Sequence, residues 1–234
     1  HTYDERAKLL IKIINENRKI EFKNKKFFIT KGSTHPEYSI FTFTDEEADF
    51  RNKYWDIKSG ELVIDVGTSY GAYSLTACAL GATVFCFEPE KTVFDDLVKN
   101  IKLNNWEQKC FPSNLALYSS PTTVNMKEYA PHWPSQSITS LYSANTLDNV
   151  ISIKEIKKID WLKIDVEGVE EHVLMGGQQA ITKFKPNIIV ECHNFMDAGI
   201  SNRVKKILLS FADYKIEEVK RDPCIILVAK VKKD

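Results

Sequence analysis

Short, continuously apolar runs alternate with amphipathic segments over most of the chain. Such runs are typical of strands that are buried on both faces of a parallel sheet. They are "ELVIDV" (61–66), "ATVFCFE" (82–88), the weaker "CFPSNLAL" (110–117), "IDWLKID" (159–165) and "NIIVECH" (187–193). Helical periodicity predicts helices over residues 70–80, 91–104, 168–183 and 200–211. The alternation predicts a doubly wound, mostly parallel α/β sheet.

The two ends of the chain depart from this alternation. Residues 4–17 place apolar side chains on one helical face, residues 21–44 suggest short strands or loops, and residues 45–55 suggest a second short helix. At the other end, "YKIEEV" and "CIILVAKV" flank a turn at 221–223 and predict an antiparallel hairpin. We expect an N-terminal extension (1–58) that packs on a core domain (59–234).

A long polar insertion over residues 119–158 interrupts the core domain. Insertions of this length in a compact domain commonly have a function. It carries Pro121, Pro131, His132, Trp133, Pro134 and Tyr142. We therefore predict a lid or substrate loop. In it, Trp133 and Tyr142 are expected to line the side of the site that binds the substrate, together with Trp55.

Composition narrows the possible partners and the location. The formal net charge is zero, which removes the electrostatic argument for nucleic acid as the main partner. No stretch is long and apolar enough to span a bilayer, and no secretory signal is visible. The five cysteines lack metal-ligand spacing and suggest buried thiols in a reducing compartment. We expect a cytoplasmic protein, whose oligomeric state is left open with a homodimer as one candidate.

Ligands of open α/β sheets bind beyond the carboxyl ends of the strands. The segments expected there are 65–71, 88, 113–115, 165–168 and 191–193, and four of these five carry carboxylates. This concentration of acidic side chains is the main clue to the chemistry of the site.

The loop "GTSYG" (67–71) is compatible with three kinds of ligand or reaction. A dinucleotide would place its pyrophosphate at the helix N-terminus, where the negative charge of Asp65 repels it. In addition, Ser69 stands where the usual dinucleotide-binding fingerprint has its second glycine. A G-x-S-x-G hydrolase would use Ser69, Asp165 and His193, which follow in the right order. However, an HGGG-type oxyanion segment is missing, and too few strands precede the loop.

The third candidate ligand is S-adenosylmethionine, which carries positive charge and no phosphate. The negative charge of Asp65 then attracts the ligand, and the two glycines allow the backbone to approach it closely. Glu88 lies about twenty residues further on and can accept hydrogen bonds from both ribose hydroxyls. A catalytically silent domain that keeps such a nucleotide-binding site is also consistent with these residues.

Five segments together resemble the FkbM family of S-adenosylmethionine-dependent methyltransferases. They are "VIDVGTSYGAYSL", "FCFEP", "TLDNV", "IDWLKIDVEGVEEHVLMGG" and "IIVECH". The resemblance covers about residues 62–193, and "LKIDVEGVE" is its most specific part. The family usually has Ala and Asn where this chain has Thr68 and Ser69. The resemblance implies a seven-stranded class I methyltransferase sheet whose last two strands are the hairpin. It also implies O-methylation of a hydroxyl on a sugar, glycan or polyketide-type small molecule.

The site residues follow from these positions. The expected cofactor-binding residues are Asp65, Gly67, Thr68, Tyr70, Gly71, Glu88, Asn114, Leu115 and Asp165. A hydroxyl acceptor must lose a proton, so a general base is needed, and the candidate catalytic residues are Asp165, Glu167, Glu191 and His193. Glu170 and Glu171 are interpreted as acids that stabilise a helix N-terminus. Asp165, Glu191 and His193 could also ligate a divalent metal, but their spacing is not diagnostic and no metal is predicted.

Overall fold

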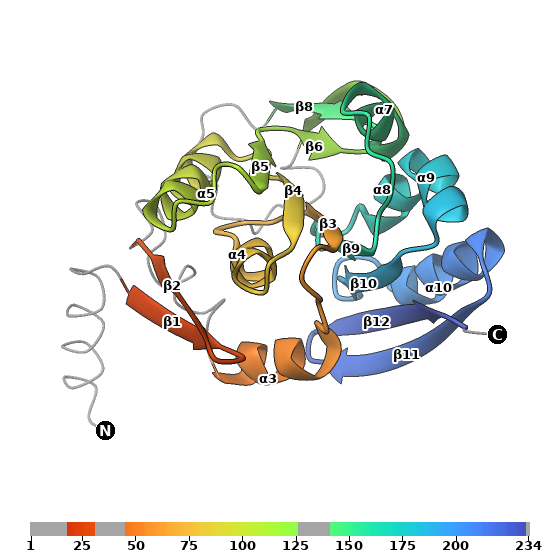
Figure 1. Cartoon of the computed structure of the whole chain (residues 1–234). Coiled ribbons are helices and arrows are strands. Elements are labelled where there is room, and N and C mark those ends of the chain that lie inside the picture. Colours follow the sequence, from red (N-terminus) through yellow and green to blue (C-terminus); the bar gives the residue numbers. More distant parts are fainter. Residues whose placement is uncertain (1–17, 31–44, 126–140, 233–234) are drawn as a thin grey trace, which may run out of the picture.

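A seven-stranded sheet forms the centre of the computed structural model, which describes residues 18–30, 45–125 and 141–232 (Figure 1). Its strand order is β11-β12-β10-β9-β3-β4-β5. The strands are β3 Leu62–Val66, β4 Thr83–Phe87, β5 Cys110–Ser113, β9 Trp161–Ile164, β10 Asn187–Cys192, β11 Tyr214–Arg221 and β12 Cys224–Val231. All pairs are parallel except those that β12 makes. The predicted fold and its terminal hairpin are confirmed.

Helices cover both faces of the sheet, because each central strand buries side chains on both sides. In β10, Ile188 and Val190 face one hydrophobic cluster while Ile189 faces the other. The first cluster also contains α7 Leu147–Ile153, α8 Glu170–Gly176, α9 Gln178–Phe184 and α10 Ile200–Phe211. The second contains α3 Asp45–Tyr54, α4 Ala72–Ala79 and α5 Lys91–Leu103. No helix in the described part of the chain is both long and apolar enough to cross a membrane.

Two predicted elements are broken in the structure. The helix expected over 168–183 divides into α8 and α9 at Gly176 and Gly177, where a Cβ on Gly176 would lie 2.0 Å from the Tyr118 carbonyl oxygen. The strand expected over 110–117 ends at Ser113. The chain then turns and forms β6 Ala116–Leu117, which joins β7 Thr122–Asn125 and β8 Leu141–Asn145 in a separate three-stranded sheet of order β6-β8-β7.

The N-terminal segment forms a hairpin of β1 Arg18–Phe22 and β2 Lys25–Ile29. Asn104, the C-cap residue of α5, fixes this hairpin, since its side chain accepts from the Phe28 N–H at 2.7 Å and donates to the Phe28 carbonyl at 2.6 Å. The predicted helix over 4–17 lies outside the described residues, as do His132 and Trp133 of the insertion. The division of the chain at residue 58 stays a prediction. All five cysteines are buried thiols.

Candidate active site at the carboxyl edge of the sheet

The connection between β3 and α4 is a tight loop with an unusual backbone. Gly67, Ser69 and Gly71 have left-handed φ values of 73°, 51° and 95°. A Cβ on Gly67 would lie 1.7 Å from the Asp165 carbonyl oxygen, so only glycine fits at this position. The loop therefore lies directly against the β9–α8 connection, which carries Asp165.

Asp65 is fully buried beneath this loop. Its Oδ2 accepts hydrogen bonds from Thr68 Oγ1 at 2.8 Å and Ser74 Oγ at 2.6 Å. Its Oδ1 lies 3.8 Å from Lys163 Nζ. Because the carboxylate is buried and hydrogen-bonded to the loop, its first effect is to fix the shape of the loop from below.

Lys163 on β9 connects the two acidic segments. Its Nζ lies 3.0 Å from Asp165 Oδ2 and donates to the Gly67 carbonyl at 3.2 Å. Burial opposes its charge, but Asp165 and Asp65 outweigh this effect and raise the pKa of Lys163 above its usual value. Lys163 is therefore a buried cation that ties the loop to the β9 strand end.

Lys163→Met is expected to lower the free energy of unfolding by about 3 kcal/mol, because it leaves the buried carboxylate of Asp65 and the partly buried carboxylate of Asp165 without their cation. Lys158→Met is a suitable control, since Lys158 also pairs with an aspartate (2.8 Å) and a backbone carbonyl (3.0 Å), yet its side chain is 55% exposed. It should cost less than about 1 kcal/mol. Chemical denaturation compares the two, and equal midpoints would show that Lys163 is not structural.

Glu88 follows β4 and is 7% exposed. Its two carboxylate oxygens accept from the backbone N–H groups of Ser69 and Glu90, each at 2.9 Å. Burial raises the pKa of Glu88 to about 7, although these two hydrogen bonds oppose the shift. Asn114 donates to the carbonyl oxygens of Glu88 and Pro89 at 2.9 and 2.8 Å. Glu88 is thus held in a fixed position at the strand end.

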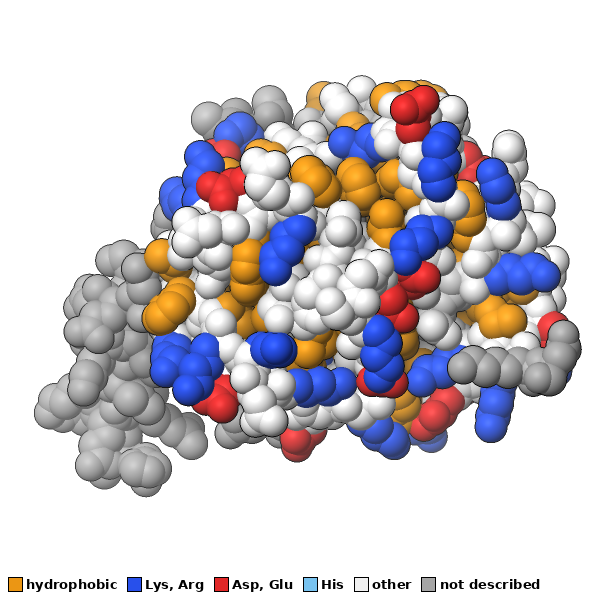
Figure 2. Space-filling model, in the orientation of Figure 1, with side chains coloured by type: hydrophobic (Ala, Val, Ile, Leu, Met, Phe, Trp, Pro, Cys, Tyr) orange, Lys and Arg blue, Asp and Glu red, His pale blue; other side chains and the backbone are white. Residues whose placement is uncertain are grey.

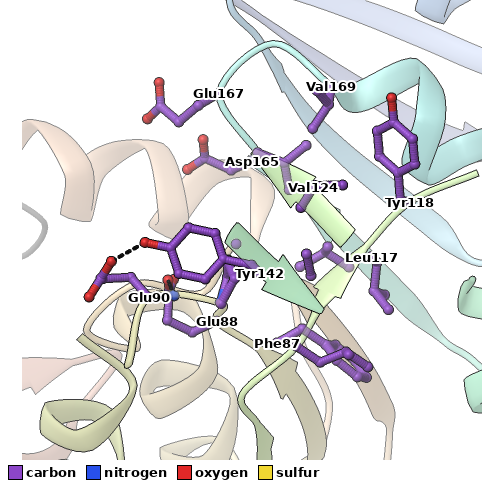
Figure 3. Close-up of a pocket in the computed structure, with 16 residues that line it drawn as sticks. Phe87, Glu88, Glu90, Leu117, Tyr118, Val124, Tyr142, Asp165, Glu167 and Val169 are labelled. Atoms are coloured by element: carbon purple, nitrogen blue, oxygen red, sulfur yellow. Dashed lines mark hydrogen bonds between the residues drawn. The ribbon is translucent and has the colours of Figure 1, made fainter. Parts of the chain in front are cut away.

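A pocket opens between these strand ends and the three-stranded sheet of the insertion (Figure 3). Its polar lining includes Glu88, Glu90, Asp165 and Glu167. The insertion sheet and the segments beside it supply Leu117, Tyr118, Val124 and Tyr142. The Tyr142 hydroxyl donates to Glu90, as the dashed line in Figure 3 shows. The described part of the insertion is therefore a wall of this pocket.

His193 lies at the end of β10 and faces the acids of the β9–α8 connection. It is 4% exposed, and Glu170 beside it is fully buried. Nδ1 of His193 lies 2.6 Å from Glu170 Oε1. Nε2 lies 3.3 Å from Glu167 Oε2 and 3.6 Å from Asp165 Oδ1. Glu170 therefore orients the ring so that Nε2 points toward the two acids that line the pocket.

The acids around His193 change its protonation and that of Glu191. Burial favours the neutral imidazole, but the hydrogen bond to Glu170 and the charges of Asp165 and Glu167 outweigh it and raise the pKa of His193 to about 9. Burial, aided by the charge of Asp165, raises the pKa of the half-buried Glu191 to about 7. At neutral pH the imidazole is charged in the unliganded protein.

Among the residues that the structure describes, two groups of side chains have ligand atoms close enough for one metal ion. They are Asp165, Glu167 and His193, and Glu191, His193 and Cys224, each with all its atoms within 4.8 Å of one another. Both use His193, whose Nδ1 is occupied by Glu170. A cation would therefore compete with the proton that the surrounding acids hold on the imidazole.

The predicted site residues fall into four groups. Gly67, Glu88, Leu115, Asp165 and Glu167 line the pocket. Asp65, Thr68, Tyr70 and Gly71 are buried in or beneath the loop. Asn114 is exposed and lies beside the end of β4. Glu191 and His193 lie beside the acids of the β9–α8 connection. Trp55 is wrong as an acceptor residue. It is fully buried and packs edge-on against Tyr73 and Trp161 at 5.2 Å.

Sequence reasoning missed Glu170 and Glu90. Glu170 was interpreted as an acid at a helix N-terminus, although it is the last residue of "LKIDVEGVE", the most specific block of the family resemblance. Glu90 is the N-cap of α5, so nothing in its local pattern indicates that it also binds Tyr142. The hydrolase alternative loses support, because in the described structure His193 hydrogen-bonds to Glu170 and makes no hydrogen bond to Ser69.

This strand order, with one antiparallel strand and a glycine loop after the first core strand, defines the class I methyltransferase fold, whose cofactor is S-adenosylmethionine. The sequence model of the methyltransferase FkbM domain matches residues 65–216. The chain therefore belongs to the FkbM methyltransferase family, as its sequence predicts.

Individual relatives agree with this assignment. The chain is 27% identical over 173 residues to hexuronic acid methyltransferase AglP of Haloferax volcanii, with 70% of this chain and 68% of the relative covered. It is 22% identical over 200 residues to methyltransferase 1 of Beauveria bassiana, with 74% and 73% covered. Among solved structures, methyltransferase FkbM from Methylobacillus flagellatus KT is similar with a TM-score of 0.57 and 16% identity. That likeness covers 82% of this chain and about half (55%) of the other.

Proposed function

We propose that this chain is an S-adenosylmethionine-dependent methyltransferase that methylates a hydroxyl of a sugar or glycan. The observation that carries the proposal is the pair of His193 and Glu170, which directs Nε2 toward two pocket acids beside the glycine loop. The similarity to a hexuronic acid methyltransferase supports a sugar as acceptor.

The cofactor would lie across the glycine loop and the end of β4. Glu88 has lone pairs left on both oxygens after its two backbone hydrogen bonds, so it can also accept from ribose hydroxyls. Leu115 and the apolar pocket wall would contact the adenine. Gly67 lets the loop backbone approach the cofactor, and the acids nearby favour a sulfonium.

The reaction needs one base beside the acceptor. Bound S-adenosylmethionine would supply the methyl group, and Nε2 of a neutral His193 would accept the proton that the acceptor hydroxyl loses. Glu170 holds the other ring proton on Nδ1 and stabilises the imidazolium that results.

Calorimetric titration with S-adenosylmethionine, followed by transfer of a labelled methyl group to a panel of glycosides, tests this function. We expect micromolar binding and labelled product from at least one glycoside. Binding without transfer to any acceptor would favour a catalytically silent domain. Absence of binding would refute the proposal as a whole.

The acceptor is proposed to be a small molecule or glycan and not a nucleic acid. The zero net charge supports this choice. On the face shown in Figure 2, lysine and arginine side chains are interspersed with acidic ones and do not form a single basic patch. Transfer of the labelled methyl group to RNA in the same assay would contradict it.

The pH dependence of turnover identifies the base. His193 must be neutral to accept a proton. The titratable groups that face it are Asp165, Glu167, Glu170, Glu191 and the Cys224 thiol. Since the pKa of His193 is raised to about 9, kcat should rise with pH, reach half of its maximum near pH 9 and level off above it. If Glu191 were the base, the midpoint would lie near its pKa of about 7. A pH–rate profile at saturating cofactor distinguishes the two.

A further inference from the structure

Phe195 is an exposed aromatic side chain immediately beside the candidate active site. It lies on the connection between β10 and α10 and is 50% exposed. Its ring meets the His193 ring edge-on, with centroids 5.8 Å apart and planes at 70°. Another exposed phenylalanine, Phe28, is 43% exposed and lies on the N-terminal hairpin. An apolar ring together with a few convergent polar groups is the composition that small-molecule sites commonly have.

The turn that carries Phe195 is fixed at both ends. The N–H groups of Met196 and Asp197 donate to the His193 carbonyl at 2.9 and 3.3 Å. Asn194 Nδ2 donates to Ser201 Oγ at 3.0 Å on α10. Because these contacts hold the backbone of the turn, the turn itself loses little entropy when a ligand covers the ring.

Further contacts join this turn to the acidic segment. Arg203 bridges Asp197 of the turn and Glu171 of α8, the latter at 2.9 Å. Met196 Cε lies 3.3 Å from the position that a Cβ on Gly168 would take. Gly168 directly follows Glu167 of the pocket. The turn that carries Phe195 therefore packs directly against the segment that carries the pocket acids.

The chemistry of this region fits a neutral sugar ring. A pyranose offers C–H groups on its faces and hydroxyl donors on its edge. An aromatic ring can cover the C–H groups. Carboxylates, which only accept hydrogen bonds, can bind the hydroxyl groups. Asp165, Glu167, Glu170 and Glu191 surround His193, while Lys163 is the cation that pairs with Asp165. This excess of acids disfavours an acceptor that is itself a carboxylate.

We infer that Phe195 is an acceptor platform, on which a neutral pyranose stacks with one hydroxyl directed toward Nε2 of His193. The inference rests on the proposed function and specifies its acceptor. It also separates this chain from its hexuronic acid methyltransferase relative, because a uronate would bring a negative charge to the acids.

Saturation-transfer NMR titrations test the platform on protein loaded with S-adenosylhomocysteine. The probes are the methyl glycosides of glucose, galactose and mannose, together with glucuronate and methyl 4-hydroxybenzoate. We expect at least one neutral glycoside to bind, with a Kd about tenfold higher (1.4 kcal/mol) in Phe195→Ala. Phe195→Trp should remain within threefold of the wild type, and Phe28→Ala should match it.

Several outcomes would overturn the platform. They are the absence of glycoside binding, equal affinities in Phe195→Ala and Phe28→Ala, binding of glucuronate as tight as that of glucoside, and Phe195-dependent binding of the phenol instead of sugars. Calorimetry with S-adenosylhomocysteine on the same samples separates this result from the broader proposal. If the protein binds S-adenosylhomocysteine but no sugar, only the platform hypothesis is refuted. If it binds neither, the proposed function is refuted as well.

Discussion

Replacing His193 by Ala is expected to lower kcat for methyl transfer by about 10²- to 10⁴-fold, the usual contribution of a general base. His193 does not line the pocket that would hold the cofactor, so the cofactor Kd should stay within about threefold, a change below 1 kcal/mol. Steady-state kinetics with the acceptor identified in the glycoside panel, combined with calorimetry, measures both quantities. A variant that retains a third of wild-type turnover would exclude His193 as the base.

His172 supplies the matched control. It lies on α8, is exposed, stacks on Tyr118 with centroids 4.1 Å apart, and binds Ser119 Oγ at 3.1 Å. His172→Ala removes an imidazole from the same region without touching the acids around His193. Its turnover should remain close to that of the wild type, and a loss equal to that of His193→Ala would point to general destabilisation.

Glu170→Gln tests the same base by a different measurement. The glutamine can still bind Nδ1, but it removes a negative charge that raises the pKa of His193. The plateau of the pH–rate profile should therefore begin at lower pH than in the wild type. A purely structural Glu170 would reduce activity without moving this midpoint. A thermal melt of the variant shows whether the protein is folded.

Glu88→Ala is expected to weaken binding of S-adenosylmethionine by tenfold or more, about 1.4 kcal/mol. The side chain occupies the end of β4 with both oxygens fixed by backbone N–H groups, so it is preorganised to accept from ribose hydroxyls. Glu61→Ala is the control. Glu61 also accepts from a backbone N–H, that of Lys58 at 2.7 Å, but it precedes β3 at the opposite edge of the sheet.

The protonation of Glu88 gives this prediction a second measurement. Its pKa is raised to about 7, so below that pH the unliganded protein carries it mostly protonated. Hydroxyl donors and a sulfonium favour the carboxylate, so cofactor affinity should rise between pH 6 and 8 with release of a proton. In Glu88→Gln the affinity should be weaker and independent of pH over this range. A wild-type affinity that does not change would contradict the assigned contact.

Local patterns predicted the architecture because parallel strands buried on both faces leave a strong signal. "LVIDV" and "NIIVEC" are apolar on both faces, and both became central strands. The two failures arise from contacts between residues far apart in the chain, which a local pattern does not contain. The helix after β9 breaks because Gly176 packs against the Tyr118 backbone, and the third strand turns away at Asn114, which binds two carbonyl oxygens near β4.

The sequence by itself determined the family, the strand-end positions and the carboxylates that gather there, because each depends on residues close together in the chain. The tertiary structure alone decided which of these acids act as partners. Glu170 and His193 are 23 residues apart, and Tyr142 and Glu90 are 52 apart, so no local periodicity could pair them. Their pairing arises from the order of the strands in the sheet, which brings β9 beside β10 and places the insertion over β4.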